Sequence, residues 1–109
     1  MNFFGLNQRE RDLLAEAFRR HPEIEEVRIF GSRAKGNHEL SSDIDLAFWG
    51  KINSQLLARL AGELDELPLP YTFDLNVYDQ VRNRDLKDHI DRVGSILYRR
   101  ESPVPRAGK

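Results

Sequence analysis

The sequence contains no cysteine. Such a chain has no disulfide framework and no thiolate metal ligand, so it is compatible with a reducing compartment, and we expect a cytoplasmic protein. No apolar run approaches the ~20 residues that span a bilayer. The N-terminus also lacks the basic-then-apolar pattern of a signal peptide. The sequence therefore predicts no membrane partner.

The length of 109 residues suits one compact domain. Hydrophobic residues make up 39% of the chain and charged residues 32%, which excludes a disordered protein and favours a small core within a solvated surface. We expect the domain to cover residues 1–101, followed by a flexible tail over 102–109 that contains two prolines and a glycine.

The net charge of −1 is unevenly distributed. Residues 1–81 carry 9 basic and 14 acidic side chains, whereas residues 82–109 carry 8 and 4. A basic C-terminal quarter attracts an acidic partner or a nucleic acid, although a solvated helix face with a charged tail gives the same pattern.

Hydrophobic periodicity predicts three helices, each preceded by an asparagine that can cap it. They cover residues 7–20, 53–67 and 83–97, and Leu97 is the last apolar residue of the third stripe. Three β-rich segments, 27–30, 43–49 and 72–78, predict strands. This order predicts an α/β domain with a small sheet of about three or more strands and helices packed on one face.

Two aspartates lie on the same side of the second predicted strand. Asp43 and Asp45 alternate with Ile44 and Leu46, so their carboxylates are about 7 Å apart and repel each other unless a cation lies between them. Asp74 has the matching phase on the next strand and joins them if the two strands are neighbours. Three carboxylates suit Mg²⁺ or Mn²⁺ better than zinc. Ordinary polar alternation on a solvent-facing strand end explains an Asp-x-Asp pattern equally simply.

A glycine-rich loop, Gly31-Ser32-Arg33-Ala34-Lys35-Gly36, directly follows the first predicted strand. Glycine allows the backbone to approach a phosphate closely, and the serine hydroxyl and neighbouring N–H groups can bind it. Arg33 and Lys35 add positive charge. A Gly-Ser pair alone indicates only a turn, but a phosphate-binding loop together with three carboxylates is what triphosphate chemistry requires.

The spacing of Gly31-Ser32 and Asp43-Ile44-Asp45, with Asp74 further along, resembles the signature of the DNA polymerase β-like nucleotidyltransferases. The small size and the Gly-Ser-Arg-Ala-Lys-Gly form resemble the minimal nucleotidyltransferase (MNT) branch. The resemblance covers roughly residues 5 to 100 and implies the mixed sheet of that fold. Lys35 departs from the arginine that is frequent there, keeping the charge but losing the planar fork.

The resemblance implies a reaction and a set of roles. Asp43, Asp45 and Asp74 would bind two Mg²⁺ ions, and Asp74 would also help to deprotonate an acceptor hydroxyl that attacks the α-phosphate of ATP. Gly31 and Ser32 would bind the β- and γ-phosphates, and Arg33 and Lys35 would stabilise developing charge.

The resemblance also implies a partner, because the chain has no acceptor-binding domain. MNT proteins are often paired with a helical HEPN toxin, and some transfer AMP to one of its tyrosines; a homo-oligomer is another way to hold an acceptor. Two other functions stay open: an antitoxin that acts by binding alone, and a transferase for a small molecule such as an aminoglycoside. Nucleic-acid polymerisation is disfavoured because no extended basic surface is present.

His21, His38 and His89 are interpreted as plain surface residues, and the environment of Trp49 is left open.

Overall fold

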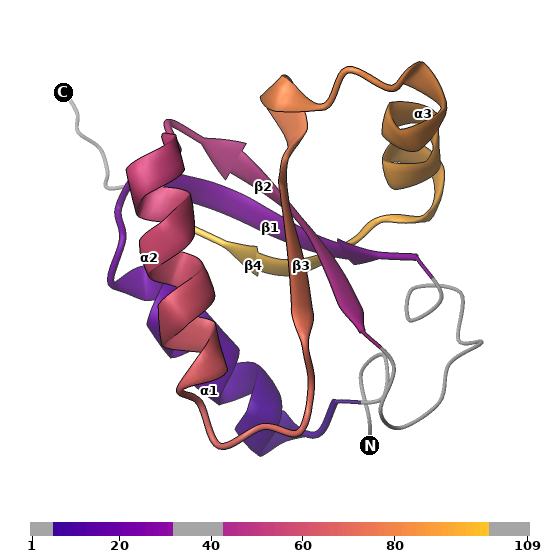
Figure 1. The fold of residues 1–109 in the computed structure, drawn as a ribbon. Coiled ribbons are helices and arrows are strands. Elements are labelled where there is room, and N and C mark those ends of the chain that lie inside the picture. Colours follow the sequence, from indigo (N-terminus) through magenta and orange to yellow (C-terminus); the bar gives the residue numbers. More distant parts are fainter. Residues whose placement is uncertain (1–5, 32–42, 101–109) are drawn as a thin grey trace, which may run out of the picture.

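The computed structural model describes residues 6–31 and 43–100, which form three α-helices, one short 3₁₀ helix and four strands (Figure 1). In chain order they are α1 (Gln8–Arg19), β1 (Ile24–Phe30), β2 (Ile44–Gly50), α2 (Ser54–Asp65), β3 (Phe73–Val77), η1 (Tyr78–Gln80), α3 (Arg84–Val93) and β4 (Ser95–Arg99). The predicted tail over 102–109 lies outside the described residues. No helix in the described ranges has the length and apolar character needed to cross a membrane.

Each helix begins after the asparagine that the sequence indicates. The side-chain oxygens of Asn7, Asn53 and Asn83 accept hydrogen bonds from the backbone N–H three residues later, at 2.8, 2.8 and 3.1 Å. At α1 the Glu10 carboxylate also accepts from the Asn7 N–H, which completes a capping box. These caps confirm the predicted starts of the three helices.

The strands form one mixed sheet in the order β3-β2-β1-β4. β1 pairs antiparallel with β2 and with β4, while β2 and β3 run parallel. The chain between β2 and β3 contains α2, the crossover that a parallel pair requires (Figure 1). The α/β class and the small mixed sheet are therefore confirmed.

The third helix is shorter than predicted, and β4 follows it. α3 ends at Val93, Gly94 leaves the helical conformation, and Leu97 lies on β4 instead of the helix. The apolar spacing of α3 continues by coincidence into Leu97. The free edge of β1, which local spacing cannot reveal, pairs with Ser95–Arg99 and makes it a strand.

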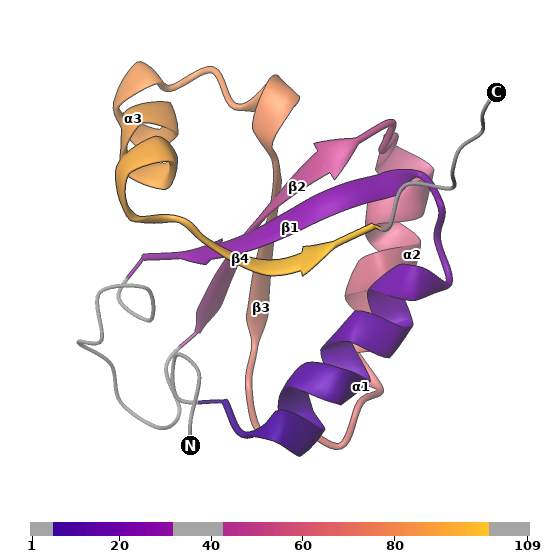
Figure 2. The ribbon, with the colours of Figure 1, turned by 180° about the vertical axis from the view of Figure 1, so that it is seen from behind.

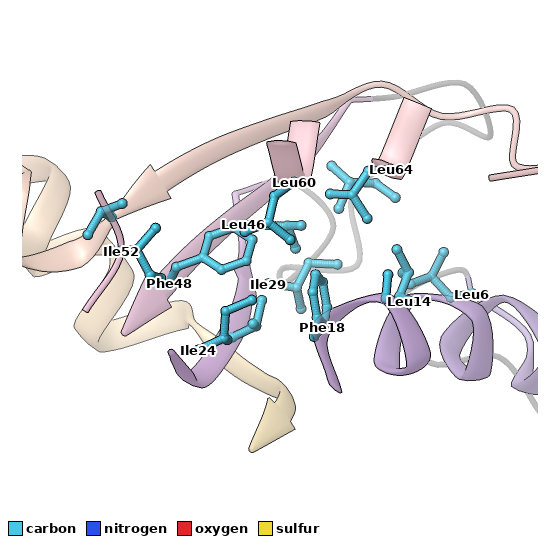
Figure 3. Close-up of a cluster of buried hydrophobic side chains, with 14 residues drawn as sticks. Leu6, Leu14, Phe18, Ile24, Ile29, Leu46, Phe48, Ile52, Leu60 and Leu64 are labelled. Atoms are coloured by element: carbon cyan, nitrogen blue, oxygen red, sulfur yellow. The ribbon is translucent and has the colours of Figure 1, made fainter. Parts of the chain in front are cut away.

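The main core lies between α1 and α2 and one face of the sheet, as Figure 3 shows. It contains buried side chains from α1, β1, β2 and α2, among them Leu14, Phe18, Ile29, Leu46, Phe48, Leu60 and Leu64. Burial of each side chain of this size stabilises the fold by roughly 1.5–3 kcal/mol relative to leaving it exposed to water. Phe48 thus belongs to the core, on the same face of β2 as Ile44 and Leu46.

The opposite face of the sheet carries α3. Ile90 of α3 is fully buried and forms a second cluster with Phe30 and Ala47. Figure 2 shows α3 at one end of the sheet, apart from α1 and α2. Two of the three helices thus cover one face as expected, whereas α3 packs on the other face.

Two histidines that were expected at the surface make contacts inside the fold. His21 is only 9% exposed, and its Nε2 lies 2.8 Å from a carboxylate oxygen of Glu63, which joins the end of α1 to α2. His89 packs edge-on against Phe30, with ring centroids 6.0 Å apart. Both roles are structural. His38 lies outside the described residues.

Candidate functional site

The three predicted aspartates lie at one end of the sheet, where β2 and β3 begin. Because the two strands are parallel and in register, Asp45 is directly opposite Asp74. Asp43 comes just before β2 and Thr72 just before β3, and the Thr72 carbonyl accepts a hydrogen bond from the Ile44 N–H at 2.8 Å. β2 and β3 are therefore neighbours, which is the condition under which Asp74 was expected to join Asp43 and Asp45.

Asp45 has the most constrained carboxylate of the three. Burial, followed by repulsion from Asp74 and Asp43, raises the pKa of Asp45 above its ordinary value. A hydrogen bond with the Asp74 carboxyl acts in the same direction. Asp43 and Asp74 are themselves exposed. The protein thus places a partly buried negative charge between two solvated ones, an arrangement that a cation would relieve.

Two polar neighbours hold the outer carboxylates, and neither was predicted from the sequence. The Thr72 hydroxyl donates a hydrogen bond to Asp43 Oδ1. The Asn76 amide lies 3.3 Å from the Leu46 carbonyl and 3.5 Å from Asp74 Oδ2. The alternation of β3 places Asn76 on the same face as Asp74, which was a usable signal. Thr72 precedes the strand, and nothing in its local sequence indicates its contact with Asp43.

Gly31 closes the site from the end of β1. It follows Phe30, the residue paired with Asp45, and adopts φ +77°, a conformation that favours glycine. A Cβ atom at this position would lie 2.2 Å from Asp45 Oδ2. Only a glycine therefore allows the backbone to turn this close to the Asp45 carboxylate. The other predicted phosphate-binding residues, Ser32, Arg33 and Lys35, lie outside the described residues.

The donor chemistry of the site fits a hard divalent cation. Carboxylate oxygens are ligands that Mg²⁺ and Mn²⁺ prefer, and the absence of a side chain at Gly31 allows the Asp45 carboxylate to lie directly against the backbone at the end of β1. Among residues 6–31 and 43–100, no group of three acidic or histidine side chains already has a metal-holding arrangement. Asp45 and Asp74 form the close pair, while Asp43 is hydrogen-bonded by Thr72. A bound ion would draw these carboxylates together.

An aromatic stack lies further along the same face of the sheet. Trp49 of β2 stacks on Tyr78 of η1 with ring centroids 4.7 Å apart. The Arg28 guanidinium lies 4.9 Å from the Trp49 ring, and the Lys87 ammonium lies 4.8 Å from the Tyr78 ring. These contacts join β1, β2, η1 and α3. The position of Trp49, left open by the sequence, is therefore explained by packing within the chain.

Comparison with known proteins identifies related sequences and folds. A family model described as "Polymerase beta, Nucleotidyltransferase" matches residues 13–103. A search of curated proteins finds no significant match. Among solved structures, a toxin–antitoxin complex with AMP-PNP aligns with a TM-score of 0.69 at 21% identity, covering 84% of this chain and 74% of that one.

Two further solved structures align over similar lengths. A toxin–antitoxin mutant in which two aspartates are replaced by glutamate gives a TM-score of 0.66 at 19% identity, covering 84% of this chain and 74% of that one. The MntA–HepT toxin–antitoxin gives a TM-score of 0.57 at 20% identity, covering 86% of this chain and 74% of that one. At these identities the structural likeness establishes the fold.

Proposed function

Because this chain belongs to the polymerase β nucleotidyltransferase family, we propose that it transfers AMP from ATP to a tyrosine hydroxyl of a helical HEPN-type toxin and so acts as its antitoxin. The observation that carries the proposal is the convergence of Asp45 and Asp74 beside Gly31. Two carboxylates on adjacent parallel strands, next to a backbone bend that lacks a side chain, are an arrangement suited to a metal-bound triphosphate.

The solved relatives support the choice of nucleotide and partner. One was crystallised as a toxin–antitoxin with AMP-PNP, an ATP analogue, and another as the MntA–HepT pair. In a third, two aspartates were replaced by glutamate. This chain covers 74% of each of these chains and has no separate acceptor-binding domain in the described residues. In this proposal a protein partner presents its own hydroxyl as the acceptor.

The three aspartates have distinct roles in this proposal. Asp43, Asp45 and Asp74 would hold two Mg²⁺ ions, or Mn²⁺ in their place, which neutralise the triphosphate and lower the pKa of the acceptor hydroxyl. Thr72 orients Asp43 by its hydrogen bond, and the Asn76 amide restrains Asp74. Gly31 allows the backbone to approach the phosphates, with Ser32, Arg33 and Lys35 of the same loop binding and neutralising them.

The transfer step balances without a further reactant. The acceptor oxygen attacks the α-phosphorus of ATP and forms a new P–O bond. The bond between the α-phosphorus and the oxygen that bridges to the β-phosphate breaks in line with the attack, and pyrophosphate leaves. Asp74, the most exposed position of the opposed pair, accepts the proton of the attacking hydroxyl. The product is a phosphodiester between AMP and the acceptor.

The test is transfer of label to the product of the neighbouring gene. The two proteins are purified separately and mixed with MgCl₂ and ATP labelled at the α-phosphate. We expect label on a tyrosine of the partner, and none with Asp45→Asn. Asp65→Asn, a change at the exposed end of α2, is the matched control and keeps full transfer.

Each outcome separates the proposed activity from its alternatives. If the partner remains unlabelled with wild-type protein, the adenylyl-transfer proposal is wrong. If Asp45→Asn still neutralises the partner, the chain acts by binding alone. Pyrophosphate release that requires a small acceptor such as an aminoglycoside would instead identify a small-molecule transferase.

A further inference from the structure

A groove lies at the opposite end of the sheet from the carboxylates, between the end of α1 and the edge strand β4. It has a volume of about 690 Å³ and is lined by Arg19, Pro22, Leu97, Tyr98, Arg99 and Arg100. These residues come from the last turn of α1, the turn before β1, the strand β4 and the residue that follows it. Segments far apart in the sequence therefore combine to form it.

The charged lining of this groove is positive on all sides. Arg19 is exposed, and no acidic side chain lines the groove with it. Arg99 is 59% exposed and pairs with Glu26 at 3.0 Å, while Arg100 donates to the Pro22 carbonyl. A guanidinium has five N–H donors, so both of these arginines keep donors for a further acceptor. Arg99 and Arg100 also belong to the basic C-terminal quarter of the sequence.

The floor of the groove is apolar and firmly held. Tyr98 packs against the buried Phe18 ring, with centroids 5.6 Å apart, and Leu97 also contacts the main core. The pairing of β4 with β1 is irregular at Leu97, because Ile96 and Tyr98 pair with adjacent residues of β1. Such a bulge disfavours the addition of another strand at this edge. Recognition here therefore depends on side chains that enter the groove.

We propose that this groove binds an acidic segment of a partner protein. Aspartate or glutamate side chains of the segment would pair with Arg19, Arg99 and Arg100, and an apolar side chain would cover Leu97 and Tyr98. Charge complementarity identifies this occupant, since three arginines around an apolar floor match alternating acidic and apolar residues.

A nucleic acid fits this surface less well than an acidic peptide. The adjoining surface, which shares Arg100, is lined by Glu23 and Glu25. A continuous phosphate backbone leaving the groove in that direction would meet these carboxylates, whereas a short acidic segment can end within the groove. The overall pI is about 6.3, so the chain does not have the excess of positive charge that is typical of nucleic-acid-binding domains.

The groove is separate from the carboxylate site. Arg99 is opposite Glu26 on β1, whereas Asp45 is opposite Phe30, four residues further along the same strand. This spacing corresponds to about 13 Å. An acidic segment in the groove leaves Asp45 and Asp74 open, so the inference does not depend on the proposed transfer reaction.

The test measures binding of a fluorescein-labelled peptide of alternating glutamate and leucine by fluorescence anisotropy. We expect saturable binding that weakens as salt is raised, and no binding of the same peptide with glutamine in place of glutamate. Arg19→Glu should weaken binding at least about threefold, and Arg19→Glu with Arg100→Glu at least about tenfold. Arg59→Glu, an exposed change on α2, is the control and should leave binding unchanged.

Other readouts keep the result specific to the groove. Arg19 is exposed, and all variants should bind Mn²⁺ like the wild type, so that a loss of peptide binding cannot be ascribed to a loss of folding. Equal peptide binding by Arg19→Glu and Arg59→Glu would overturn the proposal. Tighter binding of oligothymidine than of the acidic peptide would assign the groove to nucleic acid instead, and a dimer abolished by Arg19→Glu would assign it to a second copy.

Discussion

Replacement of Gly31 by alanine tests whether the backbone at the end of β1 is matched to the Asp45 carboxylate. Gly31 has φ +77°, and a non-glycine residue in this region costs roughly 1–2 kcal/mol. The added Cβ would lie 2.2 Å from Asp45 Oδ2, so the carboxylate must also move away from its position beside Asp74. We expect a total loss of about 2 kcal/mol, which lowers the Tm of a domain of this size by roughly 8–12 °C.

Two other glycines provide matched controls for this change. Gly50 has φ +136°, and its Cβ would lie 2.0 Å from the Glu23 carbonyl oxygen, so Gly50→Ala should destabilise the fold at least as much without touching Asp45. Gly62 lies within α2 with nothing within 4 Å of an added Cβ, so Gly62→Ala should stabilise by roughly 0.5–1 kcal/mol.

The assay combines thermal unfolding with Mn²⁺ binding below the Tm of each variant. Gly31→Ala should lose at least about tenfold in Mn²⁺ affinity, comparable to disruption of a group that orients a ligand. Gly50→Ala should keep its affinity in the fraction that is folded. If Gly31→Ala binds Mn²⁺ as tightly as Gly62→Ala does, the contact between Gly31 and Asp45 does not shape the site, and the reasoning is refuted.

Substitutions at three positions test the electrostatics and hydrogen bonds. Because the pKa of Asp45 is raised in the folded state by burial and by its acidic neighbours, its charge opposes folding as pH rises. Asp45→Asn should therefore stabilise the metal-free protein at pH 7 by about 0.5–1 kcal/mol after solvent screening, and the gain should vanish in acid. Burial alone would raise the pKa of Glu26, but its hydrogen bonds with Arg28 and Arg99 outweigh this and lower it. Glu26→Gln should lower the free energy of unfolding by about 1 kcal/mol at pH 7. The wild type loses this contribution as the pH falls through 4.5 and below, so the difference between the two proteins should disappear in acid. Urea titrations across pH will measure it. Thr72→Val should weaken Mn²⁺ binding about tenfold with a stability change of about 1 kcal/mol or less, and Thr72→Ser should restore binding; equal binding by both variants would contradict the role given to the hydroxyl.

Local sequence signals predicted the parts of this fold whose contacts are local. The caps at Asn7, Asn53 and Asn83 depend on hydrogen bonds that span three residues, and each helix begins where they indicate. The paired alternation of β2 and β3 likewise placed Asp45 and Asp74 on one face, and the parallel register then brought them together.

Contacts between distant segments could not be predicted in this way. β4 is a strand because β1 has a free edge, so the same residues read locally as the end of a helix. The bond between Thr72 and Asp43 joins residues 29 positions apart. Gly31 was expected at a turn, but its closeness to Asp45 depends on how β1 pairs with β2. The sequence indicates the candidate carboxylates, and the pairing of the sheet determines which groups contact them.

Titration of Mn²⁺ into the purified protein, followed by electron paramagnetic resonance, tests the central claim most directly because it needs neither acceptor nor partner. The wild type should bind Mn²⁺ in the presence of a non-hydrolysable ATP analogue, and Asp45→Asn and Asp74→Asn should each lose at least about tenfold in affinity. Asp65→Asn should bind like the wild type. If Asp45→Asn and Asp74→Asn also bind like the wild type, the carboxylates at the start of β2 and β3 do not form a metal site.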